Sequence, residues 1–237
     1  MKIRIIFDKD TGRRGLNTGW GVSFLIGDSV LFDTGEKGEW LLDNMENLGV
    51  NIKKIKRIVI SHDHWDHTGG LWELLKKTGG VSVYSCRGFS EEFKDRVRKL
   101  GAELIESDTV NEIESGVFVT GQIKGRYKEE YIFEQALVMK TDNGLTIATG
   151  CSHPGIVKII EKVKGDFPGD KIWMVFGGFH LMNKERREIK LIVDNFIKMD
   201  VVNAGPTHCT GYDAQEEFKR VYKDKYIAIK VGDTIEV

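Results

Sequence analysis

The segment Ser61-His62-Asp63-His64-Trp65-Asp66-His67 contains three of the six histidines in this 237-residue chain. It directly follows the apolar run Ile55–Ile60, which predicts a buried strand. On an extended segment, side chains two residues apart project to the same side, so His62 and His64 can hold one cation together. The Asp-His pair at the end of the segment suits a second cation. The spacing therefore predicts a two-metal loop whose ligands suit zinc, iron or manganese.

The remaining histidines, His153, His180 and His208, also follow apolar runs, and each lies near glycine, proline or threonine. All six histidines are therefore expected just beyond the carboxyl end of a strand. Ligand sites of layered α/β folds gather at that edge of a sheet. We expect the six side chains to contribute to one common site.

A similar order of elements is expected in the two halves of the chain. Each half begins with two apolar runs that flank a turn, Val22–Ile26 with Val30–Phe32 and Leu137–Lys140 with Leu145–Ala148. A helix, a strand, a helix and a strand follow each pair, at Trp40–Leu48, Ile55–Ile60, Leu71–Lys77 and Val81–Tyr84, and at Ile156–Val163, Ile172–Phe176, Glu185–Met199 and Val201–Ala204. This order predicts a single α/β domain, residues 1–237, made of two pseudo-repeated halves with two sheets face to face and helices outside.

The composition is that of a globular protein, with 41% hydrophobic and 30% charged residues. The 35 Lys and Arg nearly balance the 36 Asp and Glu, so no overall basic field attracts long nucleic acid, and we expect a small-molecule substrate. No run approaches the ~18 apolar residues of a membrane span, so no membrane partner is expected. The three cysteines are too few for a disulfide scaffold, which favours a cytoplasmic location. The oligomeric state is not predicted.

The motif His62-x-His64-x-Asp66-His67, preceded by Phe32-Asp33-Thr34-Gly35, resembles the metallo-β-lactamase superfamily. Further segments resemble the branch named for 7,8-dihydropterin-6-methyl-4-(ribofuranosyl)aminobenzene-5′-phosphate synthase. They are Gly15–Thr18, Ser23–Leu25, Leu31–Gly35, Ser61–Leu71, Thr149–Ile156, Gly177–Leu181 and Thr207–Gly211. The resemblance implies a four-layer αβ/βα sandwich with a dinuclear metal site between the two halves.

The resemblance also implies a set of metal ligands. It assigns His62, His64 and His153 to the first metal, and Asp66, His67 and His208 to the second. The implied cofactor is two divalent metal ions, zinc in the first place, with manganese, iron or magnesium as alternatives.

Two positions depart from the pattern of the superfamily. Many members have a histidine where this chain has Glu134-Gln135, and a bridging aspartate where it has Cys151. Cys151 is either a soft bridging ligand or a small buried residue. His180 has an open role as an alternative ligand of the second metal or as a contact to the substrate.

The predicted function is hydrolysis by a metal-bound hydroxide, on a phosphoester or a pterin-related small molecule. Asp66 would orient the hydroxide or accept its proton, and His180 would donate a proton to the leaving group or bind an oxyanion. Asp33 would orient a ligand histidine. Two other hypotheses are an iron-loaded oxidoreductase of the same fold and a non-catalytic metal-binding protein.

Substrate contacts are predicted from residues near the metal motif and from basic loops. Arg13 and Arg14 would bind a phosphorylated substrate, as would Lys124, Arg126 and Tyr127, or these residues belong to the solvated surface. Aromatic residues beside the motif would stack on a flat ring, or they are packing residues. These aromatic candidates are Trp20, Trp65 and Phe179.

Overall fold

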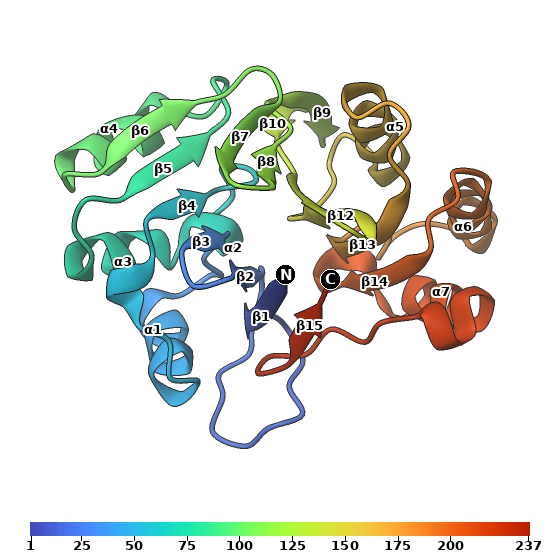
Figure 1. The fold of residues 1–237 in the computed structure, drawn as a ribbon, viewed down its shortest axis with the longest axis horizontal. Coiled ribbons are helices and arrows are strands. Elements are labelled where there is room, and N and C mark those ends of the chain that lie inside the picture. The colour runs from blue at the N-terminus through green and yellow to red at the C-terminus, as the bar shows by residue number, and fades with distance from the viewer.

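Two β-sheets face each other at the centre of the computed structural model, which describes residues 1–237 (Figure 1). The first sheet has seven strands in the order β15-β1-β2-β3-β4-β5-β6. These are β1 (Lys2–Phe7), β2 (Ser23–Ile26), β3 (Val30–Phe32), β4 (Arg57–Val59), β5 (Ser82–Ser85), β6 (Glu103–Glu106) and β15 (Thr234–Glu236). Both ends of the chain therefore meet in this sheet, where β15 pairs antiparallel with β1.

The second sheet has six strands in the order β14-β13-β12-β11-β8-β7. They are β7 (Asn111–Glu114), β8 (Val117–Val119), β11 (Leu137–Thr141), β12 (Gly144–Thr149), β13 (Ile172–Gly178) and β14 (Asn203–Thr207). A separate antiparallel hairpin, β9 (Ile123–Tyr127) and β10 (Glu130–Glu134), is paired with neither large sheet.

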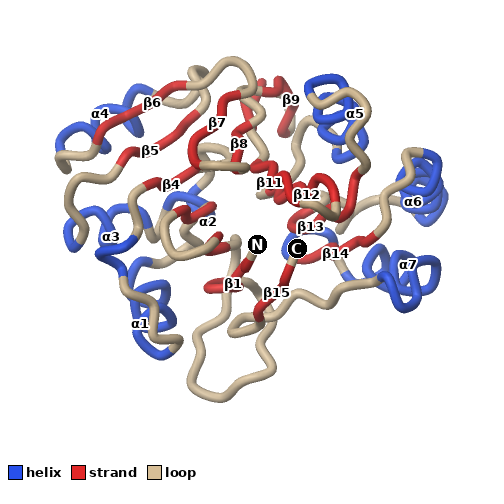
Figure 2. Tube along the Cα trace, viewed as in Figure 1, coloured by secondary structure: helices blue, strands red, loops and turns tan.

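Helices cover the outer face of each sheet (Figure 2). On the first sheet they are α1 (Gly38–Asn47), α3 (Leu71–Lys77) and α4 (Glu91–Lys99). On the second they are α5 (Ile156–Asp166), α6 (Arg186–Lys198) and α7 (Tyr212–Tyr222). The short helix α2 (Trp65–Thr68) follows β4. Three short 3₁₀ turns occupy Ile52–Lys54, His208–Thr210 and Lys223–Lys225. The four layers agree with the αβ/βα sandwich that the sequence predicts.

The central strands are apolar on both faces because each face is buried against a different layer. In β3, Val30 and Phe32 lie in the core between the sheets, whereas Leu31 packs toward the helices. In β13, Phe176 lies between the sheets and Val175 lies under the helices. Side chains alternate along a strand, so double burial produces the near-continuous apolar runs of the sequence.

The predicted repeat is confirmed by the strand pairing. In the first half β2 and β3 pair antiparallel, and β4 and β5 then add in parallel. In the second half β11 and β12 pair antiparallel, and β13 and β14 add in parallel. The carboxyl ends of the parallel strands in both halves meet at one edge of the sandwich. No helix is long and apolar enough to cross a membrane.

The core between the sheets depends on a contact between Phe24 and Phe176, whose ring centroids are 4.9 Å apart. Replacement of Phe176 by alanine should lower the free energy of unfolding by about 3–5 kcal/mol, because it leaves a cavity between the two sheets. Urea denaturation followed by circular dichroism measures this change. The control Leu191→Ala, at an exposed position of α6, should change it by less than about 0.5 kcal/mol. Equal effects of the two substitutions would contradict this account of the core.

Candidate metal centre

All six histidines come together at the edge where the parallel strands end. His62 and His64 follow β4, and His67 lies on α2. The other three follow β12, β13 and β14 in turn; they are His153, His180 and His208. The structure therefore places side chains from both halves of the chain around one site, as the sequence predicts from the strand ends.

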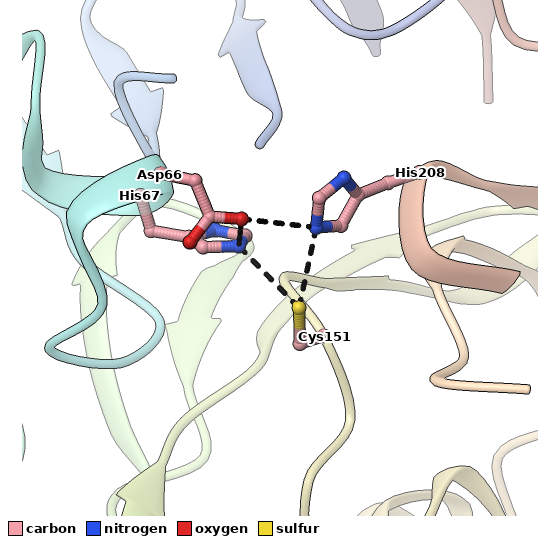
Figure 3. A group of neighbouring side chains, drawn as sticks. All are labelled: Asp66, His67, Cys151 and His208. Carbon is pink, nitrogen blue, oxygen red and sulfur yellow. Dashed lines mark hydrogen bonds and ion pairs between the residues drawn. The ribbon is translucent and has the colours of Figure 1, made fainter. Parts of the chain in front are cut away.

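One group of donor atoms consists of the side chains of Asp66, His67, Cys151 and His208, which point toward one another (Figure 3). The Asp66 carboxylate oxygen lies 3.4 Å from Nε2 of both His67 and His208. The Cys151 sulfur lies 3.5 Å from Nε2 of His67 and 3.2 Å from Nε2 of His208. A tetrahedral zinc ion with bonds of about 2.0–2.3 Å holds its ligand atoms roughly 3.3–3.8 Å apart. The spacing of these four donors therefore fits a divalent cation.

A second group consists of His62, His64 and His153, whose donor atoms lie within 4.8 Å of one another. Nε2 of His62 and both ring nitrogens of His153 are buried and have no hydrogen-bond partner in the protein. Buried polar atoms are almost always paired, so these nitrogens require a partner that is not a protein atom. A metal ion held by one nitrogen of each ring would be such a partner.

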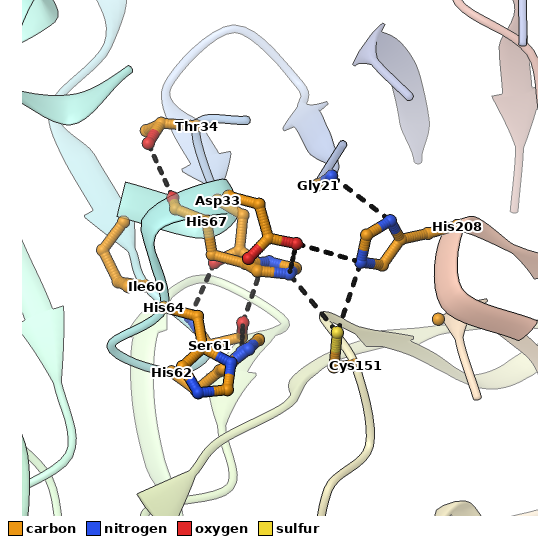
Figure 4. Close-up of polar contacts among 12 residues, drawn as sticks. Gly21, Asp33, Thr34, Ile60, Ser61, His62, His64, His67, Cys151 and His208 are labelled. Atoms are coloured by element: carbon orange, nitrogen blue, oxygen red, sulfur yellow. Dashed lines mark hydrogen bonds and ion pairs between the residues drawn. The ribbon is translucent and has the colours of Figure 1, made fainter. Parts of the chain in front are cut away.

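The carboxylate of Asp33 orients the histidines of the first half (Figure 4). One of its oxygens lies 2.7 Å from Nδ1 of His67, which leaves Nε2 of that ring facing the Asp66 group. Asp33 also accepts hydrogen bonds from the amide and the hydroxyl of Ser61, both at 2.7 Å. The Ser61 hydroxyl in turn lies 2.8 Å from Nδ1 of His62. One carboxylate therefore directs histidines of both donor groups.

Glu134 orients a donor loop of the second half, as Asp33 orients histidines of the first. The sequence did not predict this role. Its buried carboxylate accepts hydrogen bonds from the backbone amides of Cys151, Ser152 and His153, at 3.0, 2.7 and 2.7 Å. Burial raises the pKa of Glu134 to about 7, although these three amides lower it. The only signal in the sequence was that Glu134-Gln135 stands where many superfamily members have a histidine.

The charges of the two donor groups differ in the protein without metal. Burial, and after it the neighbouring His180 and His64, lowers the pKa of His153 to about 3, so this ring is neutral and one of its two nitrogens has a free lone pair. Burial would lower the pKa of His208, but Cys209 and Asp66 outweigh it and raise the pKa to about 9. Burial would likewise raise the pKa of Asp66, but His67 and His208 hold it well below its usual range. The Asp66 group therefore requires positive charge, which protons supply when no cation does.

His180 lies beside these groups and belongs to a third one, with Cys151 and His153. Its ring centroid is 4.5 Å from that of His153. The His180 backbone has a positive φ of 54°, and the side chain is exposed to the cavity. This position is compatible with either of the roles that the sequence leaves open.

The donor groups form the floor of a cavity of about 460 Å³. The exposed rings of Trp20, Trp65 and Tyr127 line its mouth. Trp20 stands edge-on to His208, with 5.6 Å between the ring centroids. Trp65 is 62% exposed, because α2 turns it outward while Asp66 and His67 turn inward.

The other predicted substrate contacts lie elsewhere. Phe179 is 1% exposed and packs against Phe196 and Phe218 under the helices, so the prediction that its ring contacts a substrate does not agree with the structure. Phe179 and His180 follow β13, and their side chains point in opposite directions, Phe179 into the core and His180 into the cavity. Arg13 and Arg14 are exposed on the loop before β2 and do not line the cavity.

A sequence model described as the metallo-beta-lactamase superfamily matches residues 21–170 of the chain. The chain belongs to this superfamily. The superfamily fold implies bound metal ions, and the residues present fit that cofactor by donor type, spacing and unpaired nitrogens.

Similar proteins include other members of the superfamily. A protein of Methanocaldococcus jannaschii named 7,8-dihydropterin-6-methyl-4-(beta-D-ribofuranosyl)-aminobenzene-5'-phosphate synthase is 29% identical, over 91% of this chain and 89% of its own. The solved structure of Tm1679, described as a metal-dependent hydrolase of the beta-lactamase superfamily, is 30% identical. The two structures align over 100% of this chain and 99% of the Tm1679 chain, with a TM-score of 0.83. The superfamily match and the similarity to a named synthase indicate an enzyme.

The alternative roles of Cys151 can be separated with cobalt as a spectroscopic probe. A thiolate bound to cobalt gives a ligand-to-metal charge-transfer band in the near ultraviolet, so the cobalt-loaded protein should show this band. Cys151→Ser should lose it, and Cys86→Ser, at a buried cysteine that belongs to neither donor group, should keep it. Persistence of the band in Cys151→Ser would assign it to another thiolate, of which Cys209 in the cavity lining is the candidate, and would contradict a bond from Cys151.

The backbone contacts of Glu134 predict an effect on metal binding without any direct bond to the metal. Glu134→Ala leaves three buried amides unpaired, so the affinity for zinc should fall about 10–100-fold, as for other residues that orient ligands. Competition with a chromophoric chelator measures this affinity. The control Glu130→Ala, exposed on the same strand, should bind zinc like the wild type. An unchanged affinity in Glu134→Ala would contradict the orienting role.

Proposed function

We propose that this chain is a dinuclear metal-dependent hydrolase that acts on a phosphoester or a pterin-related small molecule. The observation that carries the proposal is that two donor groups lie side by side on the floor of one cavity with an aromatic mouth. Zinc is the proposed metal, because three histidines in one group and a nitrogen, oxygen and sulfur set in the other suit it. When bound, two divalent cations lower the pKa of a water molecule and polarise a phosphoryl oxygen.

The residues of the chain have separate tasks in this proposal. Asp66 is ionised at the floor of the cavity and orients the attacking water through a hydrogen bond. His180 stands at the side of the cavity, where its imidazole can donate a proton to the leaving oxygen. The rings of Trp20 and Trp65 provide apolar surface for a flat part of the substrate. Single-domain organisation and a cytoplasmic location stay predictions of the sequence.

The relatives support the proposal in two different ways. Tm1679 is described as a metal-dependent hydrolase. The M. jannaschii relative is named a synthase, and the compound in its name contains a pterin, an aminobenzene ring and a phosphate. That name favours a second candidate function, in which an organic group rather than water accepts the transferred part of the substrate. Both functions use the same metals and the same aromatic mouth.

A panel of aryl phosphomonoesters and phosphodiesters, supplied with zinc, manganese or magnesium, tests the proposed hydrolysis. The wild-type protein should hydrolyse at least one of them, and Asp66→Ala should abolish turnover with unchanged circular dichroism. His180→Asn should lower kcat by about 100-fold or more while the metal content stays the same. Asparagine is the suitable replacement because it tolerates the positive φ of His180.

Three results would contradict parts of this proposal. No hydrolysis with any metal would leave group transfer as the stronger candidate. Wild-type kcat in His180→Asn would remove His180 from the mechanism. Bound iron with visible absorption, together with no hydrolysis, would favour the oxidoreductase.

A further inference from the structure

We infer that the turn of the β9–β10 hairpin binds an anionic group of the substrate, and that Lys128 on this turn makes the site specific for anions. The inference rests on the proposed function for the position of the substrate, and it names a specificity-determining residue that the sequence did not indicate.

The hairpin is held in place over the metal centre by contacts at its base. Glu134, at the end of β10, binds the backbone of the loop that carries His153. Gly125 packs so closely on the same loop that a Cβ atom there would lie 2.7 Å from the nitrogen of Pro154. Lys158 of α5 donates a hydrogen bond of 2.8 Å to the carbonyl of Lys124. These contacts fix where the turn lies relative to the cavity.

The strand alternation of β9 decides which side chains reach the cavity. Lys124 and Arg126 share the outer face, where both lie over the ring of Tyr131 at 3.4 and 5.7 Å. Gly125 and Tyr127 share the other face. The two basic residues predicted from the sequence to grip a phosphate therefore lie on the far side of the hairpin, and neither lines the cavity.

Tyr127 extends the hairpin over the first donor group. Its ring centroid lies 4.8 Å from that of His64 and 5.0 Å from that of His153, edge-on to both. The next residue, Lys128, has a positive φ of 55° and returns its side chain toward the Tyr127 ring, with Nζ 5.3 Å from the ring centroid. The turn thus places one aromatic ring and one ammonium group at the cavity mouth beside His64.

Lys128 is the only lysine or arginine among the residues that line the cavity. No carboxylate lies within ion-pair distance of its ammonium group. The one carboxylate in the cavity lining, Asp66, is engaged at the floor by His67 and His208. Lys128 is therefore an unpaired cation at the entrance to a metal centre, and an anionic oxygen of a ligand is the partner that fits it.

The ligand class follows from the surfaces around this cation. Aromatic rings on both sides of the cavity, Trp20 near His208 and Tyr127 near His64, suit a flat ring. The ammonium group of Lys128 suits a phosphate or a carboxylate attached to that ring. We therefore expect aryl anions to bind better than neutral aryl compounds of the same shape.

Equilibrium binding of phenylphosphonate, which has no ester bond to hydrolyse, tests the role of Lys128 in the zinc-loaded protein by calorimetry at low ionic strength. Lys128→Met should raise the Kd by about three- to tenfold, because one charge-assisted contact is lost. Lys128→Arg should restore most of the affinity. The matched control is Lys124→Met, on the outer face of the same hairpin, which should bind like the wild type. Benzoate tests whether a carboxylate binds in the same way. The Kd of phenol, which is neutral, should be the same in the wild type and in both Lys128 variants.

The outcomes separate this inference from the proposed function. An unchanged Kd in Lys128→Met, or an equal loss in Lys124→Met, would overturn the inference even if the protein hydrolyses phosphoesters. Weaker binding in Lys128→Met alone would support it even if the wild-type protein hydrolyses none of them. An effect of Lys128→Met that is as large for phenol as for phenylphosphonate would also overturn it, because charge would not be the cause. The difference between the variants should shrink as salt is added, since the contact is exposed.

Discussion

The metal centre depends on the hydrogen bonds that the buried carboxylate of Asp33 accepts. This carboxylate contacts Nδ1 of His67 and both the amide and the hydroxyl of Ser61. Because the Ser61 hydroxyl also meets His62, one side chain at the end of β3 aligns histidines that belong to two donor groups. Without it, Nδ1 of His67 would lose this contact, and Ser61 would lose the acceptor of both its amide and its hydroxyl.

Two other buried carboxylates act in the same way on the remaining loops. Glu134 accepts three backbone amides of the loop that carries Cys151 and His153. Asp8, at the end of β1, accepts a 2.7 Å hydrogen bond from the hydroxyl of Thr207, next to His208. Asp8, Asp33 and Glu134 are each nearly or fully buried. Burying a carboxylate is costly unless it is hydrogen-bonded. Each of these three carboxylates accepts its hydrogen bonds from a loop of the metal centre or from the residue next to one, and so restrains that loop.

The superfamily fold explains why these loops meet. The parallel strands β4, β12, β13 and β14 end at one edge of a sandwich of two sheets, so both halves contribute donors to the same cavity. The β9–β10 hairpin adds a wall that belongs to neither sheet. Glu134 at its base orders the donor loop, and Tyr127 and Lys128 at its turn face the cavity mouth. One hairpin therefore connects the metal centre to the surface where a substrate enters.

The sequence by itself determined the elements and donors that depend on local pattern. The apolar runs of β3 and β13 predicted doubly buried strands, and the dense spacing from His62 to His67 predicted donors just after a strand. The roles of Glu134 and Lys128 had no such signal, because their partners lie far away in sequence or are not protein atoms. Phe179 and His180 show the same limit, since adjacent residues at a strand end turned to opposite sides, one into the core and one into the cavity. Only the tertiary structure decided these directions, because hairpin register, backbone conformation and the packing of distant layers select which way each side chain faces.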